Sequence, residues 1–458
     1  MKERPAYRCG ECGWTATKWV GRCGECQAWG TVEDISVPRV RTTAAGPVTT
    51  AAVPISEVDA ALARAVPTGV DELDRVLGGG VVPGAVVLLA GEPGVGKSTL
   101  LLDVAARFTQ HGRALYVTGE ESASQVRLRA DRIGALRDDL LHASEIDLAA
   151  VLGHIDAVKP QLLVVDSVQT VASADVDGAP GNISQVREVA GALIRVSKER
   201  GIATILVGHV TKDGSIAGPR LLEHLVDVVL QFEGDRHSRL RMVRGVKNRY
   251  GPADEVGCFD LSDMGIEGLA DPSGLFLSQR HEAVPGTCVT VTVEGKRPLV
   301  AEVQSLVMPA VNGTPRRTVS GLDNGRVAMI LAVLQRRANI HVALGDVYAA
   351  TVGGVRLTEP ANDLAVALAL ASASKNEALA TGLIAVGEVG LAGEIRRVTG
   401  TSRRLSEAAR LGFTHALVPP DVGKVPSGIE AIEVGDLGRA LRIAFPGAEI
   451  IRFGARRR

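Results

Sequence analysis

Apolar runs long enough to span a membrane are missing from this sequence, because glycine, proline or charged residues interrupt each of them. The first residues, MKERPAYRC, also lack the apolar core of a secretory signal peptide. These two absences predict a cytoplasmic protein with no membrane partner. Neither sign of charge is in excess, since 51 basic and 52 acidic residues give a net charge of −1. Any contact with nucleic acid must therefore come from local basic clusters.

The composition is also not polar enough to leave most of the chain disordered. Of the 458 residues 46% are hydrophobic, which is enough to build two or three domains. One stretch differs, because Ser36 to Pro54 is rich in Thr, Ala, Pro and Val and has neither helical nor strand periodicity. We interpret residues 36–54 as a linker. It separates a short segment, 1–35, from residues that we divide into domains 55–284 and 285–458.

Cysteine is scarce, but four of the six cysteines lie within the first 26 residues, as Cys9-x2-Cys12 and Cys23-x2-Cys26. Four thiolates at this spacing can surround one Zn²⁺ tetrahedrally, and a module this small depends on the metal for its fold. A pair of disulfides is the alternative, which the missing export signal disfavours. We predict a structural zinc module in residues 1–35.

Aromatic and basic side chains accompany these cysteines, namely Trp14, Lys18, Trp19, Arg22 and Trp29. They are suited to stack and pair with nucleic acid, and equally suited to form the small core of the module. Both roles stay open from the sequence. Elsewhere, the isolated Cys258 and Cys288 are expected to be inert core thiols.

The segment GEPGVGKS at residues 91–98 has the Gly-x4-Gly-Lys-Ser spacing of a phosphate-binding loop. An apolar run at 85–90 predicts the strand before it, and residues 98–110 predict the helix after it, which disfavours an ordinary glycine turn. Glycines let backbone N–H groups converge on a phosphate at the helix N-terminus. Lys97 would reach the β- and γ-phosphates and Ser98 would ligate Mg²⁺. The expected ATP-binding residues are Gly91, Glu92, Pro93, Gly94, Val95, Gly96, Lys97, Ser98 and Thr99.

Strands and helices alternate from Ile55 to about Leu269. This alternation predicts an α/β fold with a mostly parallel sheet covered by helices on both faces. One helix is expected over 183–200, with Asn182 as its N-cap and Gly201 just past its end. The predicted strands cover residues 85–90, 114–118, 161–166, 203–208 and 226–232.

Polar residues follow three of these strands, at the edge of the sheet where ligands bind. Asp166 ends the strand 161–166, where an acid can orient Mg²⁺ or water, although it could also be a simple turn residue. Glu120 is our first choice to polarise the attacking water, with Glu121 as the other candidate. His209 is expected to sense the γ-phosphate, with capping of its strand as the alternative.

Several segments resemble the RecA-like ATPases: PTGVDELDRVLGGGVVPGAVVLLAGEPGVGKSTLL, YVTGEES, LLVVDSVQT and VGHVTKDGSIAGPRLLEHLVD. With RGVKNRYG at residues 244–251 and the four-cysteine module, the chain resembles the bacterial RadA (Sms) DNA-repair family over essentially its whole length. Tyr250 stands where the family motif Lys-Asn-Arg-Phe-Gly has Phe. The resemblance implies a DNA-dependent ATPase that forms a homo-oligomeric ring, expected to be a hexamer. It would act on single-stranded or branched DNA in recombinational repair, alongside a recombinase.

By position in this motif, Lys247 and Arg249 resemble cationic fingers that reach the γ-phosphate bound by a neighbouring subunit. Strand parity predicts that four cations present their charge on one face: Arg239, Arg241, Lys247 and Arg249. A solvated edge strand with the same charges is the alternative.

Two Gly-rich loops, 173–181 and 212–220, are candidates for DNA contact, because RecA-like proteins place DNA-binding loops at these positions. The second loop is the better candidate, since Lys212 and Arg220 can contact phosphates whereas the first loop is acidic. Both could also be ordinary connecting loops, because neither contains an aromatic residue that could stack on a base.

From about Pro285 the sequence resembles the proteolytic domain of Lon, in VYAATVGGVRLTEPANDLAVALALASA and GEVGLAGEIRRVTGTSRRLSEAARLGF. Matching these segments puts Ala361 at the nucleophilic serine and Ser402 near the catalytic lysine, so the dyad is absent. We expect an α/β Lon-protease-like domain with a scaffold, ring-forming or DNA-supporting role. An ATP-dependent protease and a non-DNA ATPase switch or kinase are the alternative functions. A DNA track or a solvated helix face would explain its basic residues, Arg396, Arg397, Arg403, Arg404 and 456–458.

Overall fold

The computed structural model describes residues 7–34, 52–57, 63–209, 222–234, 239–277, 283–310, 315–342 and 345–445. The chain forms two compact units, Met1–Ala60 and Ala61–Arg458. Some predicted features lie outside the described residues: positions 36–51 of the linker, Lys212 and Arg220 of the second loop, and the basic residues 456–458. Within the described part, no helix is both long enough and apolar enough to cross a membrane.

The first unit contains a small antiparallel sheet of three strands in the order β2-β1-β3. The strands are β1 Tyr7–Cys9, β2 Thr15–Ala16 and β3 Val32–Asp34, and a short 3₁₀ helix, η1 Ile55–Glu57, follows later in the unit. Among the described residues of this unit, the buried core consists of Cys9, Cys23 and Val32, with Trp14 packed beside them. A core of this size is too small to hold a fold without a metal or a disulfide.

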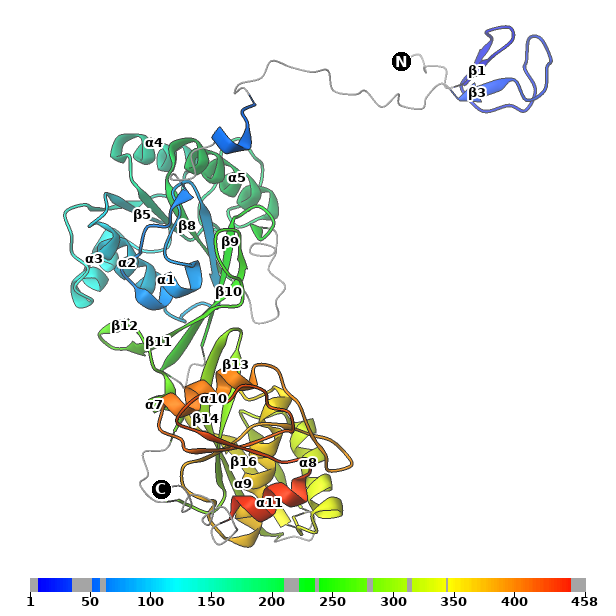
Figure 1. Ribbon diagram of the computed structural model, residues 1–458. Coiled ribbons are helices and arrows are strands. Elements are labelled where there is room, and N and C mark those ends of the chain that lie inside the picture. The colour runs from blue at the N-terminus through cyan, green and yellow to red at the C-terminus, as the bar shows by residue number, and fades with distance from the viewer. Residues whose placement is uncertain are drawn as a thin grey trace. The chain divides into compact units, whose positions relative to one another are not determined.

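The second unit begins with a nine-stranded sheet in the order β12-β11-β10-β9-β4-β8-β7-β5-β6 (Figure 1). Strands β9 to β6 in this order are parallel, and β10 to β12 continue the sheet antiparallel. The mostly parallel sheet is therefore confirmed. The strands are β4 Val86–Gly91, β5 Ala114–Thr118, β6 Leu140–Ser144, β7 Leu162–Asp166, β8 Ala203–His209, β9 Val228–Glu233, β10 Leu240–Asn248, β11 Val256–Ser262 and β12 Gly265–Gly268.

Helices cover both faces of this sheet, as expected, because its central strands are buried on both sides. One face packs against α1 Asp71–Leu77, α2 Lys97–Phe108 and α3 Ala123–Arg132, and the other against α4 Leu148–Val158 and α5 Ile183–Arg200 (Figure 1). Helix α5 has the predicted bounds. Asn182 occupies its N-cap position without a side-chain hydrogen bond, and Gly201 ends it in the left-handed conformation, with φ of 67°.

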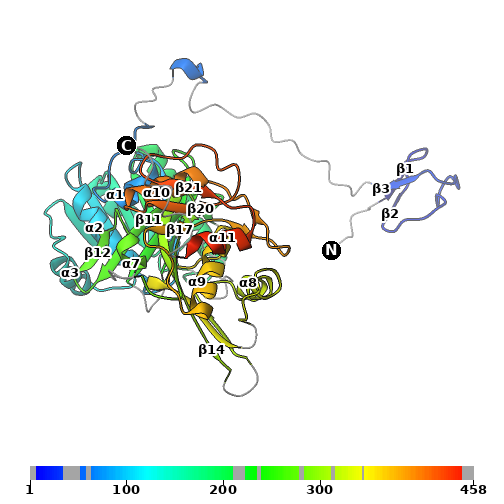
Figure 2. The same cartoon turned by 60° about the horizontal axis from the view of Figure 1, so that its bottom comes forward.

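The C-terminal domain has a seven-stranded sheet in the order β15-β16-β14-β13-β17-β20-β21 and a separate two-stranded ribbon, β18-β19. Helix α9 is buried along most of its length against β13, β14 and α8. The far end of β14 projects from the domain (Figure 2). The strands are β13 Thr287–Glu294, β14 Arg297–Pro309, β15 Arg317–Ser320, β16 Gly345–Thr351, β17 Leu383–Ala385, β18 Glu388–Val389, β19 Ile395–Arg396, β20 His415–Val418 and β21 Glu430–Glu433; the helices are α7 Ser273–Phe276, α8 Asn324–Arg337, α9 Asp363–Lys375, α10 Thr401–Arg410 and α11 Leu437–Ala444, with 3₁₀ turns η3 Val352–Gly354 and η4 Pro360–Asn362.

The turn between β13 and β14 joins the C-terminal domain to the nine-stranded sheet. Arg297 is buried, forms an ion pair with Glu72 of α1, and donates to the carbonyl oxygens of Leu269 (2.9 Å) and Ala270 (2.8 Å). Cys258 of β11 and Cys288 of β13 belong to one continuous apolar core. Burial raises the pKa of Cys258 to about 11 and raises that of Cys288 further, so both thiols are protonated core groups.

Candidate functional site

The four N-terminal cysteines converge on one point. Cys9 Sγ lies 3.7 Å from Cys26 Sγ, Cys12 Sγ lies 3.5 Å from Cys23 Sγ, and all four sulfur atoms lie within 4.8 Å of one another. A tetrahedral zinc site with Zn–S bonds of about 2.3 Å has S···S edges of about 3.8 Å. The donor set therefore fits one Zn²⁺ with no open position, which makes it a structural site. All six cysteines of the chain are free, so the disulfide alternative is wrong.

The aromatic residues of the zinc module divide into two groups. Trp14 packs on Gly24, whose Cβ position would lie 2.7 Å from the indole, and it contributes to the small core. Trp19 and Trp29 are 65% and 74% exposed, and the Arg22 guanidinium lies 5.8 Å from the centre of the Trp29 ring. One tryptophan thus serves the core, while two remain at the surface.

The phosphate-binding loop lies between β4 and α2, as the spacing predicted. β4 ends at Gly91 and α2 begins at Lys97, with Gly96 at the N-cap position. Gly94 and Gly96 have φ of 80° and 110°, which an L side chain rarely adopts. A Cβ at Gly91 would lie 2.6 Å from the Phe232 carbonyl oxygen, so the loop can follow this path only with glycine there.

Lys97 is buried, and its Nζ donates to the carbonyl oxygens of Gly91 and Glu92, both at 2.8 Å. Burial lowers the pKa of Lys97 to about 8, and the nearby carboxylates of Asp166 and Glu120 partly oppose this shift. An anionic phosphate oxygen would stabilise this ammonium more than neutral carbonyl groups do. The environment of Lys97 therefore suits a polyphosphate ligand.

Asp166 lies at the carboxyl end of β7 with its side chain buried. Its Oδ2 accepts a hydrogen bond from the Tyr116 hydroxyl at 2.7 Å. Burial, followed by the charge of Asp166, raises the pKa of Tyr116, which keeps the phenol protonated as a donor. In the described part of the chain Asp166 Oδ1 has no hydrogen-bond partner. A water molecule of a Mg²⁺ ion would satisfy this oxygen, so Asp166 fits the role expected of it beside the metal. Ser98 follows Lys97 in the first turn of α2.

Glu120 and Glu121 lie in different environments, although they are neighbours in sequence. Glu120 Oε1 accepts from Ser167 Oγ (2.8 Å) and lies 3.1 Å from His209 Nε2. The hydrogen bond with His209 is the main cause that lowers the pKa of Glu120, so the carboxylate form is favoured. Glu121 instead forms a two-point ion pair with Arg129, at 2.7 and 2.5 Å. Glu121 is thus held by an arginine, and Glu120 stays our candidate for the base.

Ser167 is a site residue that the sequence analysis did not identify. It is fully buried, follows Asp166 directly, and donates to the candidate base. The available signal was its hydroxyl at the carboxyl end of an apolar strand that already ends in an acid. Two further polar atoms here, Gln169 Oε1 and His209 Nδ1, are buried without a partner among the described residues. Unsatisfied polar atoms at one edge of a sheet indicate a site built to receive a polar ligand.

Lys247 and Arg249 lie at the amino-terminal ends of the parallel strands, whereas this cluster lies at their carboxyl ends. β10 runs antiparallel to β9, and Asn248 pairs with Val228 at the amino-terminal end of the parallel strands. Lys247 Nζ donates to the carbonyl oxygens of Glu223 and Val226, both at 2.8 Å. The structure therefore does not bring these two cations to the P-loop of their own chain.

The prediction that four cations of this strand share one face is wrong. A β-bulge between Gly245 and Lys247 shifts the register, so residues on its two sides no longer alternate together. Arg241 is buried and its Nε donates to the Val95 carbonyl oxygen at 3.0 Å, while Arg239 pairs with Asp260 at 2.9 Å. The edge-strand alternative is also wrong, because β10 lies between β9 and β11.

The Lon-like segment contains no peptidase dyad at the matched positions. Ala361 is buried in an apolar cluster, and Ser402 is exposed on α10. Arg404 of the same helix is buried and forms a two-point ion pair with Glu359, at 2.5 and 2.8 Å. Arg404 is thus a core residue and cannot belong to a basic surface track. Acidic partners also neutralise Arg396 and Arg397, through Glu394 and Asp421.

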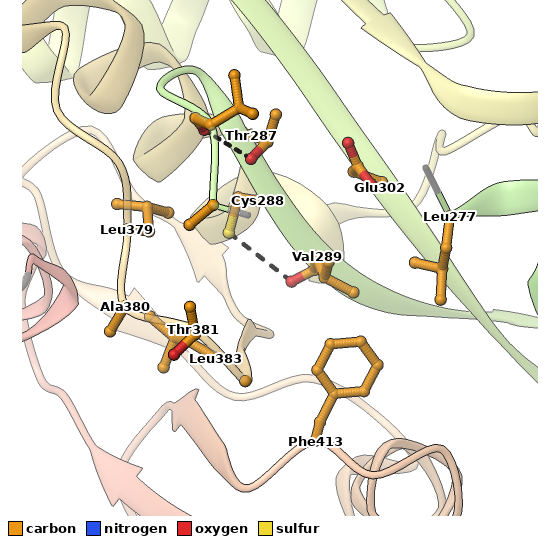
Figure 3. Close-up of a pocket in the computed structure, with 13 residues that line it drawn as sticks. Leu277, Thr287, Cys288, Val289, Glu302, Leu379, Ala380, Thr381, Leu383 and Phe413 are labelled. Atoms are coloured by element: carbon orange, nitrogen blue, oxygen red, sulfur yellow. Dashed lines mark hydrogen bonds between the residues drawn. The ribbon is translucent and has the colours of Figure 1, made fainter. Parts of the chain in front are cut away.

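A cavity of about 270 Å³ lies in the C-terminal domain (Figure 3), and none of its lining residues belongs to the P-loop. The start of β13, the segment 379–383 and Phe413 line it. The Cys288 side chain at its wall is a buried thiol whose Sγ contacts the Val289 carbonyl oxygen at 3.7 Å.

Three family models match parts of the chain. A model described as an AAA domain matches residues 52–215, one described as a rubredoxin metal binding domain matches 7–34, and one described as subunit ChlI of Mg-chelatase matches 352–422. Together with the geometry above, these matches define a P-loop ATPase with an N-terminal four-cysteine zinc module and a ChlI- and Lon-like C-terminal domain.

Curated relatives match this arrangement over nearly their whole length. The chain is 58% identical to the DNA repair protein RadA of Mycolicibacterium smegmatis over 463 residues, which covers 98% of this chain and 99% of the relative. It is 58% identical to the protein of that name from Mycobacterium tuberculosis, over 96% of this chain and 93% of the relative, and 45% identical to that of Streptococcus pyogenes serotype M1, over 97% and 99%. The chain belongs to the RadA family of DNA repair proteins, which confirms the resemblance seen in its motifs.

Proposed function

We propose that this chain is a DNA-dependent ATPase of recombinational repair that works as a homo-oligomeric ring. In this proposal the ring is a motor that moves on single-stranded or branched DNA and processes recombination intermediates, for example by branch migration. The family, the ATPase domain and the names of the DNA repair relatives support this function.

In the proposed reaction Glu120 accepts a proton from the attacking water as the water oxygen bonds to the γ-phosphorus of ATP. The bond from that phosphorus to the bridging oxygen breaks, and ADP leaves. Lys97 stabilises the negative charge on the phosphates, and His209 and Ser167 keep Glu120 oriented. When bound, Mg²⁺ would supply charge neutralisation at the phosphates; Ser98 is its proposed protein ligand, and Asp166 would orient the ion through a water molecule.

The observation that carries the oligomeric part of the proposal is the separation of two sets of residues. The carboxyl ends of the parallel strands carry the first set, Lys97, Glu120 and Asp166. The amino-terminal ends carry the second set, Lys247 and Arg249. Cationic fingers at the amino-terminal ends of the strands can complete a nucleotide site only if that site belongs to another subunit. A head-to-tail contact of this kind is heterologous, and it closes into a ring when the rotation allows.

The loop 173–181 supports the DNA part of the proposal, because it lies at the nucleotide edge and is built around one side chain. Gln185 Nε2 donates to the carbonyl oxygens of Ser173 (3.0 Å) and Gly178 (3.3 Å), and its Oε1 accepts from the Ser173 N–H (2.8 Å). The path of the loop is thus held by hydrogen bonds within the chain. In the second loop, Lys212 and Arg220 stay the proposed phosphate contacts.

A comparison of ATP turnover with and without single-stranded DNA tests this function. We expect DNA to stimulate turnover, and we expect Lys212→Ala with Arg220→Ala to remove the stimulation while basal turnover stays. Arg113→Ala is the matched control, because Arg113 is a basic residue that precedes β5 at the opposite edge of the sheet. Equal turnover with and without single-stranded or branched DNA would leave the alternative of an ATPase switch without a DNA role.

A further inference from the structure

We propose that Asp227 is a positioning residue that holds Arg249 in place and ties this finger to the strand leading into the P-loop of its own chain. The inference rests on the proposed role of Arg249 toward a neighbouring subunit. It extends that role, because it assigns to a residue outside the Lys-Asn-Arg motif the task of orienting the finger.

Asp227 is a buried acid directly before β9, with 3% of its side chain exposed. A buried carboxylate is stable only if cations and hydrogen-bond donors surround it. Its Oδ2 accepts from the Val86 N–H at 3.1 Å, and its Oδ1 lies 3.1 Å from Arg249 Nη1 and 3.6 Å from Lys198 Nζ. All three partners come from different segments of the chain.

The backbone of Asp227 links the same two segments a second time. Its N–H donates to the Val86 carbonyl oxygen at 3.0 Å, and its carbonyl oxygen accepts from the Arg249 N–H at 3.3 Å. Val86 is the first residue of β4, and β4 ends at Gly91, where the P-loop begins. One residue therefore connects the base of the P-loop strand with the finger.

The neighbours of Arg249 are anchored independently. Asn248 Nδ2 donates to the Leu77 carbonyl oxygen at the end of α1, at 3.0 Å. A Cβ on Gly251 would lie 3.1 Å from Gly78 Cα, so glycine permits this close approach to α1. These contacts hold the backbone on both sides of Arg249, whereas the Asp227 carboxylate fixes the direction of the Arg249 side chain.

The arrangement leaves Arg249 able to act outward. Its side chain is 53% exposed, so the guanidinium can keep one N–H on Asp227 and present others to a phosphate of the neighbouring subunit. Lys198 remains beside Asp227 as a second cation. The buried charge of Asp227 therefore stays compensated even while Arg249 shares its own charge with a phosphate.

Asp227→Asn tests this inference, because the amide can still accept from Val86 but carries no charge. In the assembled protein we expect ATP turnover to fall by about fivefold to tenfold, while the affinity for nucleotide changes little. The double variant Asp227→Asn with Arg249→Ala should turn over ATP no more slowly than Arg249→Ala alone. Asp260→Asn, which breaks the pair with Arg239 in the same sheet, is the matched control and should keep wild-type turnover.

Mixed oligomers separate positioning from simple structural support. Asp227→Asn subunits keep their own P-loop if the inference holds, so mixing them with Lys97→Ala subunits, whose fingers are intact, should recover turnover above the sum of the two variants. If Asp227 only supports β4, its own P-loop is impaired and mixing recovers nothing, which overturns the inference. Should Asp227→Asn fail to assemble, Asp227→Glu keeps the charge at a changed distance and is expected to give the same recovery.

Arg249→Ala serves as the reference for both proposals. If Arg249→Ala retains wild-type turnover in the assembled protein, the finger role itself is wrong. If Arg249→Ala lowers turnover but Asp227→Asn retains the wild-type value, the finger role stands and the positioning role of Asp227 is overturned.

Discussion

Replacing Ser167 by alanine should weaken catalysis and shift its pH dependence. Ser167 Oγ donates a 2.8 Å hydrogen bond to Glu120, and hydrogen bonds to charged groups contribute about 1.5–3 kcal/mol. The Glu120 side chain is 41% exposed, so solvent screening reduces the expected loss to about 1 kcal/mol. Because this hydrogen bond favours the carboxylate form, its loss should raise the pKa of Glu120.

The sign of the shift follows from the carboxylate being the active form of the base. Hydrogen bonds from His209 and Ser167 lower the pKa of Glu120, with Lys97 contributing by its charge. The wild-type protein should therefore keep its base ionised to a lower pH than Ser167→Ala does. In the variant the acid limb of the kcat profile should move to higher pH, while KM for ATP stays nearly constant.

The assay is steady-state ATP turnover from about pH 3 to 8, a range that starts below the ordinary pKa of a glutamate carboxyl group, about 4.3. Ser197→Ala is the control, because Ser197 is also a buried serine but bonds to the Leu193 carbonyl oxygen and Thr204, away from the site. An unshifted acid limb in a folded Ser167→Ala protein would refute the assignment of Glu120 as the base held by Ser167.

Three further predictions concern the P-loop, the zinc module and the C-terminal domain. Lys97→Ala should lower ATP turnover by roughly 10²-fold or more with the fold retained, as kinetics and circular dichroism would show; near-normal turnover would remove the P-loop assignment. Cys9→Ser with Cys12→Ser should lose one Zn²⁺ per chain, measured by metal analysis, yet retain nucleotide binding; full zinc occupancy would contradict the four-thiolate site. The intact protein with ATP, Mg²⁺ and DNA should not cleave an unfolded casein substrate, because Ala361 has no side-chain oxygen; ATP-dependent cleavage that a mutation in residues 285–458 removes would restore the protease alternative.

Periodicity and motif spacing predicted much of the ATPase fold. Helix α5 and strand β5 have the expected bounds, and the P-loop lies between its predicted strand and helix. Strand β6 was missed, because its sequence LLHAS is short, half-buried and partly polar at the edge of the sheet. The three antiparallel strands β10 to β12 were not predicted as a unit, since strand direction depends on pairing between distant segments.

The candidate site was less accessible from sequence alone, because its decisive contacts join segments far apart in the chain. The choice between Glu120 and Glu121 depends on Arg129 and His209, which a local pattern cannot place. The parity argument for Arg241 and Lys247 failed because one extra residue in a bulge reverses the face of every residue after it. The pairing register that reveals such a bulge exists only in the folded sheet.

The central claim is that each nucleotide site combines the P-loop of one subunit with the finger of the next. Its most direct test is the ATP turnover of oligomers mixed from Lys97→Ala and Arg249→Ala subunits, with mixed assembly demonstrated. Random mixing in equal amounts joins an intact P-loop to an intact finger at about a quarter of the interfaces, so turnover should recover toward about a quarter of the wild-type rate. Turnover equal only to the sum of the two separate variants, in oligomers shown to be mixed, would contradict the account.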